Sequence, residues 1–128
     1  MKRSIGVLAA AISLWAASWA AVAHHSANAQ WHVDQKLEIT GVLKEVKNIM
    51  PHAHWFFDIA DKDGKVATWD FETVTANQLR RQGVSIKDDI KVGQTYKLVY
   101  SPSRTGAVNV GFLVGIYING KRYDFFAL

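Results

Sequence analysis

Most of the chain after residue 36 consists of short runs in which apolar and polar residues alternate. Successive side chains of a β-strand point to opposite faces, so this alternation predicts strands with one face in a core. Clusters of Gly, Asp, Asn, Ser and Pro separate the runs and predict turns. Gly41, inside the first run, is expected to mark a bulge or a close approach of another segment. We therefore expect five strands, at residues 37–46, 54–60, 66–72, 96–100 and 112–118.

One segment, residues 75–82, carries the signals of a helix. Thr73 or Thr75 can cap its start, and Gly83 stands where a helix commonly ends. The resulting order is three strands, one helix and two strands, which is the order of an OB-like barrel. Closure of a barrel also removes the exposed edges of a small sheet. We therefore predict a mainly β fold, a five-stranded OB-like antiparallel barrel with one short helix. The alternative is a small open antiparallel sandwich with one helix.

The first 23 residues have the pattern of a secretory signal peptide. A basic head, Lys2-Arg3, precedes an uncharged apolar stretch that ends in the small residues Ala-Val-Ala at 21–23. Polar sequence follows at once, so we expect cleavage, export to the periplasm and no membrane anchor afterwards. Cleavage after Ala29 is the less favoured alternative, because it lies farther from the apolar stretch. The predicted organisation is a signal peptide at 1–23, a histidine-containing arm at 24–36 and the barrel domain at 37–128.

Composition excludes several classes of function. The chain has 128 residues and no Cys, which rules out disulfides, thiolate metal sites and thiol catalysis. Loss of the leader leaves 13 basic against 11 acidic residues, so the mature charge of +2 gives no electrostatic basis for nucleic-acid binding. No phosphate-binding glycine loop and no nucleophile-elbow serine is present. We therefore assign no catalytic residue.

His52 and His54 stand two residues apart at the start of a predicted strand. Residues at this spacing share one strand face, opposite Trp55 and Phe57, so the two imidazoles are expected to project together. A His-x-His pair is a recurring way to place two nitrogens on one zinc or copper ion. The alternative is that both rings are simply solvated beside Pro51.

A second group of histidines lies on the arm. If cleavage follows Ala23, His24 becomes the N-terminus, and its α-amine and imidazole can chelate one copper ion together. His25 follows directly. The alternative is a disordered arm whose histidines bind nothing. Further along the arm, Trp31 is expected to cover the barrel as an apolar anchor.

Asp70 and Glu72 form the third candidate group. They share a strand face opposite Trp69 and Phe71. Their carboxylates can supply oxygen ligands, orient a metal-bound histidine or perform acid–base work, and the alternative is ordinary solvated charge. A stable site needs about four ligands. We therefore expect any metal site to combine arm and strand residues, from the set His24, His25, His52, His54 and Glu72.

The chain resembles a family of small exported bacterial proteins that is known only as a domain of unknown function. The resemblance rests on Ala-His-His-Ser at residues 23–26, Pro-His-Ala at 51–53 and Trp-Asp-Phe-Glu at 69–72, and it extends over residues 23–120. The family pattern has Asn where this chain has Met50, and Trp where it has Val84. The resemblance implies a periplasmic OB-like barrel and no assigned activity. It also implies motif positions for His24, His25, His52 and Glu72.

These observations predict a non-enzymatic periplasmic β-barrel that binds a metal, with copper the favoured ion, or another ligand. The runner-up is an OB-type module that binds another exported protein or a small molecule and no metal. A third hypothesis is a copper-dependent oxidoreductase that uses an N-terminal His24. Neither nucleic acid nor, after cleavage, a membrane is expected as a partner.

Overall fold

The structure is a computed structural model that describes residues 28–126. The predicted signal peptide and both arm histidines, His24 and His25, therefore lie outside the described residues. A compact unit begins at Trp31. Among the described residues, no helix is both long enough and apolar enough to cross a membrane.

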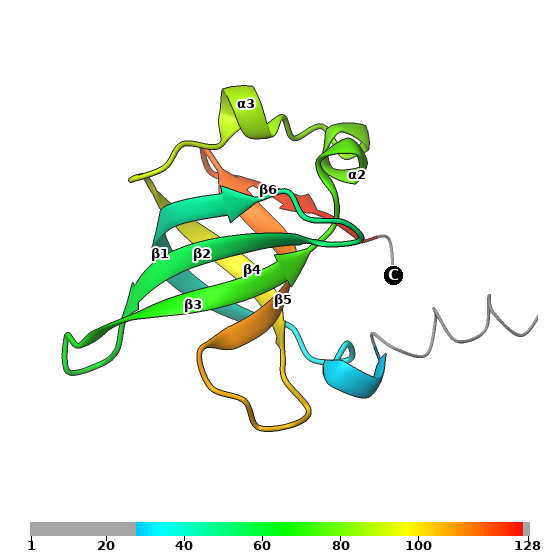
Figure 1. Cartoon of the computed structure of the whole chain (residues 1–128). Helices are drawn as coiled ribbons and strands as arrows, with labels where there is room; N and C mark the ends of the chain where they lie inside the picture. The colour runs from blue at the N-terminus through cyan, green and yellow to red at the C-terminus, as the bar shows by residue number, and fades with distance from the viewer. Residues whose placement is uncertain (1–27, 127–128) are drawn as a thin grey trace, which may run out of the picture. The chain divides into compact units, whose positions relative to one another are not determined.

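Six strands and two short helices follow one another along residues 37–124 (Figure 1). They are β1 (Leu37–Lys47), β2 (Ala53–Ala60), β3 (Val66–Thr73), α2 (Ala76–Arg81), α3 (Ile86–Asp89), β4 (Thr95–Pro102), β5 (Val110–Ile118) and β6 (Lys121–Asp124). The five predicted strands are all present, with ends within three residues of those expected.

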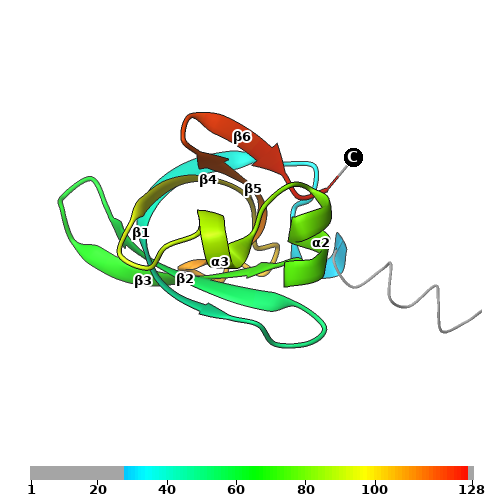
Figure 2. The ribbon, with the colours of Figure 1, turned by 90° about the horizontal axis from the view of Figure 1, so that it is seen from above.

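The first five strands form a closed barrel, which Figure 2 shows from above. Antiparallel pairing joins β3, β2, β1, β4 and β5 in that order, and a parallel pairing between β3 and β5 closes the ring. The prediction of a mainly β, five-stranded barrel is confirmed, and the alternative of an open sandwich is wrong. The barrel is mixed rather than wholly antiparallel, because β5 runs alongside β3 in the same direction where the ring closes. That the barrel is OB-like stays a prediction.

Two elements were not expected. β6 forms a hairpin with β5 through Asn119 and Gly120, which both have positive φ angles, 50° and 79°, as the tightest hairpin turns require. Its four residues, Lys-Arg-Tyr-Asp, are too few and too polar to show an alternating run. The prediction of a single helix is also wrong. α2 matches the expected segment, but α3 adds one turn that begins after Ser85, whose hydroxyl accepts a bond from the Asp88 amide.

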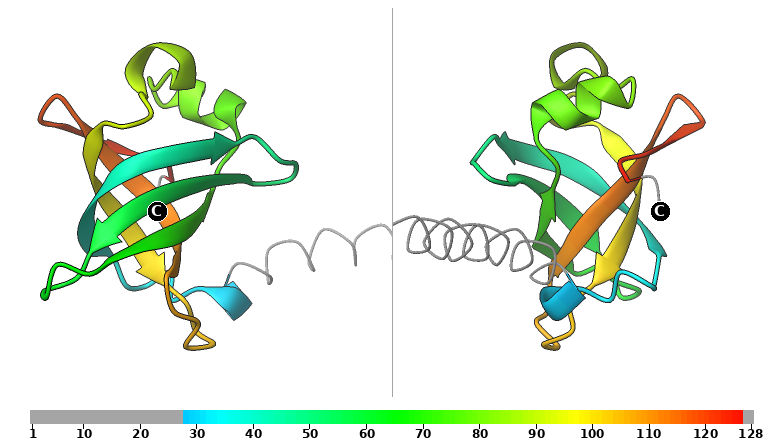
Figure 3. Two further views of the ribbon diagram at one scale, coloured as in Figure 1. Left: turned by 60° about the vertical axis from the view of Figure 1, so that its left-hand side comes forward. Right: turned by 90° about the vertical axis from the view of Figure 1, so that its right-hand side faces the viewer.

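The barrel interior is a continuous apolar core. Trp55, Phe57 and Phe71 are fully buried, and Leu98 and Ile116 reach them from the other side of the ring. The helices α2 and α3 lie over one end of the barrel, while the β2–β3 turn and the β4–β5 loop lie at the other end (Figure 3). Leu79 of α2 is fully buried and packs into the core at the helical end.

Gly41 is a point of close approach. A Cβ at this position would lie 2.7 Å from Cγ1 of Ile59 and 3.1 Å from the carbonyl oxygen of Asp58, so a side chain does not fit without movement of β2. The irregularity in the β1–β2 pairing falls later, between Leu43 and Glu45. Of the two readings of this glycine, close approach is therefore the correct one.

Replacement of Thr75 by Ala will weaken the start of α2. The Thr75 hydroxyl accepts a bond from the Gln78 amide, and Oε1 of Gln78 accepts from the Thr75 amide at 3.1 Å, so each residue satisfies the other's backbone. Loss of such a cap costs about 1 kcal/mol of unfolding free energy. Urea unfolding of Thr75→Ala will measure it. The control is Thr75→Ser, which keeps the hydroxyl, and an equal loss in both variants would contradict the capping role.

Candidate functional site

The histidine pair lies on the outer face of the barrel. Trp55 and Phe57 of β2 point inward and are fully buried. His54 and Phe56 alternate with them along the strand and therefore point outward. His52 stands just before β2, two residues from His54. Its side chain is 44% exposed and that of His54 is 32% exposed, so both rings are open to solvent while one side of each contacts the barrel.

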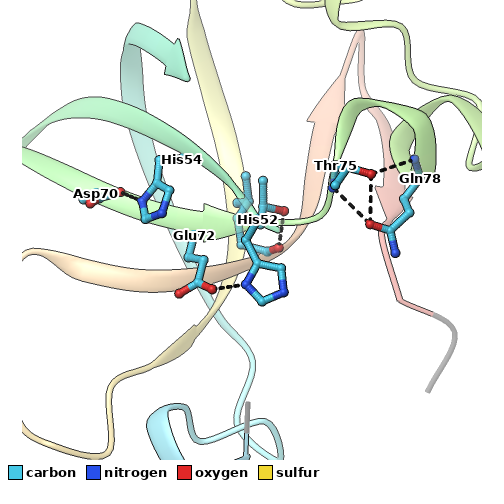
Figure 4. A network of polar contacts seen from close by, with 8 residues as sticks. His52, His54, Asp70, Glu72, Thr75 and Gln78 are labelled. Atoms are coloured by element: carbon cyan, nitrogen blue, oxygen red, sulfur yellow. Dashed lines mark hydrogen bonds and ion pairs between the residues drawn. The ribbon is translucent and has the colours of Figure 1, made fainter. Parts of the chain in front are cut away.

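Each imidazole is held by a carboxylate from the neighbouring strand β3 (Figure 4). Nδ1 of His54 lies 2.9 Å from Oδ1 of Asp70, and Nδ1 of His52 is hydrogen-bonded to Oε1 of Glu72. In the β2–β3 register His54 stands directly opposite Glu72. The four side chains therefore alternate along the two strands as Asp70, His54, Glu72 and His52. We call them the His–carboxylate row.

The pairing determines which ring nitrogen is free. An ionised carboxylate only accepts hydrogen bonds, so in each pair Nδ1 is the nitrogen that carries the proton and donates it. In a neutral imidazole the other nitrogen, Nε2, then has the lone pair. No side chain among residues 28–126 is hydrogen-bonded to Nε2 of His52 or His54. Both histidines thus present the nitrogen that is able to bind a metal ion.

The row contributes little to the stability of the fold. The side chains of Asp70 and Glu72 are 38% and 19% exposed, and ion pairs this accessible to water contribute about 0–1 kcal/mol each. Farther along the same face, Asp58 is satisfied by other partners. A hydrogen bond from the Thr68 hydroxyl, aided by Lys44, holds the pKa of the Asp58 carboxyl below its ordinary value. Asp58 is therefore not free to join the row.

Aromatic residues border the row at His52. The His52 ring lies 6.4 Å from that of Phe112 on β5, edge to face, and Phe112 stacks on Trp31 at 6.0 Å. Trp31 is 8% exposed, and its carbonyl accepts a bond from Nε of Arg104 at 2.9 Å. The expectation that Trp31 covers the barrel is confirmed. The predicted arm is therefore fixed, at Trp31, against the same aromatic ring that His52 contacts.

The structure brings together three of the five predicted metal ligands. His52, His54 and Glu72 lie in the row, whereas His24 and His25 lie outside the described residues. Within residues 28–126 there is no group of three or more His, Asp or Glu side chains arranged to hold one ion. Glu72 and Asp70 are engaged as hydrogen-bond partners of the rings, which is the orienting role considered for them above. The row by itself thus offers two nitrogen ligands.

Phe112 is the neighbour of the site that sequence reasoning missed. It comes from β5, sixty residues after His52, and reaches the row only because β5 pairs with β3 at Glu72. No local pattern indicates such a pairing.

Comparison with known proteins gives one match. Neither the curated proteins nor the solved structures include a significant match to this chain. A family model matches residues 11–111, which is most of the chain and includes the whole row. The resemblance to a family without an assigned activity is confirmed, and the chain belongs to the family of unknown function DUF6152.

Proposed function

We propose that this chain is an exported, non-enzymatic β-barrel protein that binds a metal ion, with copper the favoured metal, through His52 and His54. The observation that carries the proposal is the pairing of both Nδ1 atoms with carboxylates. Metal-binding histidines characteristically donate their other ring N–H to a carboxylate or carbonyl, which fixes the ring and makes the ligating nitrogen more basic.

The chemistry of the donors supports copper over harder ions. Imidazole nitrogens suit copper, nickel and zinc, and copper heads the affinity order of the divalent ions. Carboxylates suit magnesium and calcium, but those of Asp70 and Glu72 are already hydrogen-bonded to the imidazoles. With no Cys in the chain, a thiolate site is excluded.

A stable metal site has about four ligands, and the His–carboxylate row supplies only two nitrogens. We propose that the arm completes it, with His24 or His25 as donors, and that cleavage after Ala23 adds the α-amine of His24. The proposal is supported by Trp31, which stacks on Phe112, the same ring that His52 contacts.

Titration of the exported protein with Cu²⁺ will show one tightly bound ion at neutral pH. Binding will weaken progressively as the pH falls below about 6, because a metal displaces protons from imidazoles and protonated rings cannot ligate. Calorimetry at a series of pH values measures this, and the protein must carry no affinity tag, whose histidines also bind copper. Mass spectrometry of the same sample identifies the N-terminal residue.

Two results would contradict the proposal. The first is an absence of stoichiometric binding at pH 7 in protein that begins at His24. The second is an affinity that does not change between pH 7 and pH 5, since histidine ligation requires that dependence. If protein that begins after Ala29 still binds copper, the row remains the proposed site, and His24 and His25 are not its ligands.

A further inference from the structure

Trp69 separates two hollows at the barrel end opposite the helices. One has a volume of about 330 Å³ and is lined by Ile39, Ile59 and Ala67 together with Trp69. The other has a volume of about 320 Å³ and lies between Trp69, Tyr100 and the β4–β5 loop at Ala107 and Val108. Each volume falls in the range of small-molecule sites, which occur preferentially at barrel mouths. This end of the barrel is distinct from the His–carboxylate row, because Trp69 lines the interior side of β3.

The aromatic residues at this end form a fixed wall. Trp69 stacks on Phe71 with centroids 5.7 Å apart, and both rings meet Tyr100 edge to face, at 5.9 Å and 5.5 Å. Gly111 allows this packing, since a Cβ there would lie 2.7 Å from Cδ2 of Tyr100 and 3.0 Å from Phe71. The wall is therefore rigid, and its rings are available to contact another ring.

The polar groups at the two hollows define the ligand's charge. The first hollow has one acidic and one basic lining residue, Asp61 and Lys65, and the second has none of either kind. The lining of each hollow therefore carries no net charge. Tyr100 is 8% exposed, burial raises the pKa of its hydroxyl, and no described residue is hydrogen-bonded to that hydroxyl. Tyr100 lines the second, mainly apolar hollow, so its hydroxyl is a donor that no other described residue uses.

We propose that the barrel mouth around Trp69 is a second binding site, which takes a small uncharged ring compound that carries a hydrogen-bond acceptor. The ring packs in the second hollow against Trp69 and Val110, and its acceptor receives a hydrogen bond from the Tyr100 hydroxyl, because Tyr100 lines this hollow and not the first. The site is independent of metal binding, because no residue of the row lines either hollow.

Acetophenone is a suitable probe, since it joins one aromatic ring to one neutral carbonyl. In a titration followed by ¹⁵N–¹H NMR, the indole signal of Trp69 will shift saturably. The signal of Trp55, which is fully buried in the core, will stay in place and serves as an internal control. Trp69→Phe identifies the Trp69 signal while keeping an aromatic ring at that position. The variant that lacks His52 and His54 will bind acetophenone as the parent does.

Ala107→Leu reduces the second hollow and will weaken acetophenone binding about tenfold or more. Ala67→Leu fills the first hollow, which Tyr100 does not line, and will leave this binding unchanged. Val66→Leu is the matched control, because Val66 is 59% exposed, precedes Ala67 on β3 and lines neither hollow. Parent-like binding by Ala107→Leu would overturn the proposal, as would equal shifts of both indole signals. Tighter binding of benzoate or maltose than of acetophenone would overturn the assigned ligand class.

Discussion

Replacing His52 and His54 together by Ala will abolish stoichiometric Cu²⁺ binding and leave the fold intact. The row supplies the only pair of imidazoles in the described part of the chain whose Nδ1 atoms are both held by carboxylates. Without these two imidazoles, the arm alone offers fewer donors than the roughly four that a stable site needs. Both side chains are on the outer face, so their loss opens no cavity in the core. Calorimetry measures the binding, and far-UV circular dichroism with urea unfolding checks the fold.

The matched control is His32→Ala. His32 is also a partly exposed histidine of the described residues, but no carboxylate contacts its ring. This variant should bind copper as the parent does. If the His52/His54 double variant also bound copper as tightly as the parent, the row would be ordinary surface and the proposed function would fail.

The second large effect is expected in the core. Phe71→Ala will reduce the free energy of unfolding by about 3–5 kcal/mol, because Phe71 is fully buried and its loss leaves a cavity between three other rings. Small domains are stable by only about 5–15 kcal/mol, so this variant will be close to unfolding at 37 °C. Equilibrium urea unfolding at 25 °C measures the change.

Phe56→Ala is the control for this prediction. Phe56 has the same side chain and neighbours Phe57 on β2, but it points outward, where Nζ of Lys47 lies 4.9 Å from its ring centroid. Its loss should cost about 1 kcal/mol or less. Equal losses for the two variants would contradict the division of β2 and β3 into an inner and an outer face.

The strands and their inner and outer faces can be predicted from the sequence, because both depend on local periodicity. Alternation along β2 and β3 is enough to place His54 outside and Trp55 inside. The parallel pairing of β3 with β5 depends on residues about forty positions apart, such as Phe71 and Gly111, and no local pattern encodes it. β6 and α3 were missed for another reason, since four residues are too few to show a period.

The candidate site can likewise be predicted only in part from the sequence. A shared face for His52 and His54 follows from their spacing, as it does for Asp70 and Glu72. Which ring meets which carboxylate depends on the β2–β3 register. The turn at Asp61–Gly64 contributes to that register, because Oδ1 of Asp61 accepts bonds from two amides of the turn and Gly64 has a φ of 81°. Sequence reasoning predicted a turn there but not the offset of two residues that each pair shows.

The parallel pairing of β3 with β5 also affects how the row can move. β3 lies between β2 and β5 along Asp70–Glu72, so neither of its edges is free there. Opening β3 locally would break hydrogen bonds on both sides, at a free energy that approaches that of global unfolding. The backbone that carries the two carboxylates therefore keeps its place for as long as the barrel is folded. An ion held by the row would leave by exchange of its ligands for water, and the rate of its release would not depend on local unfolding.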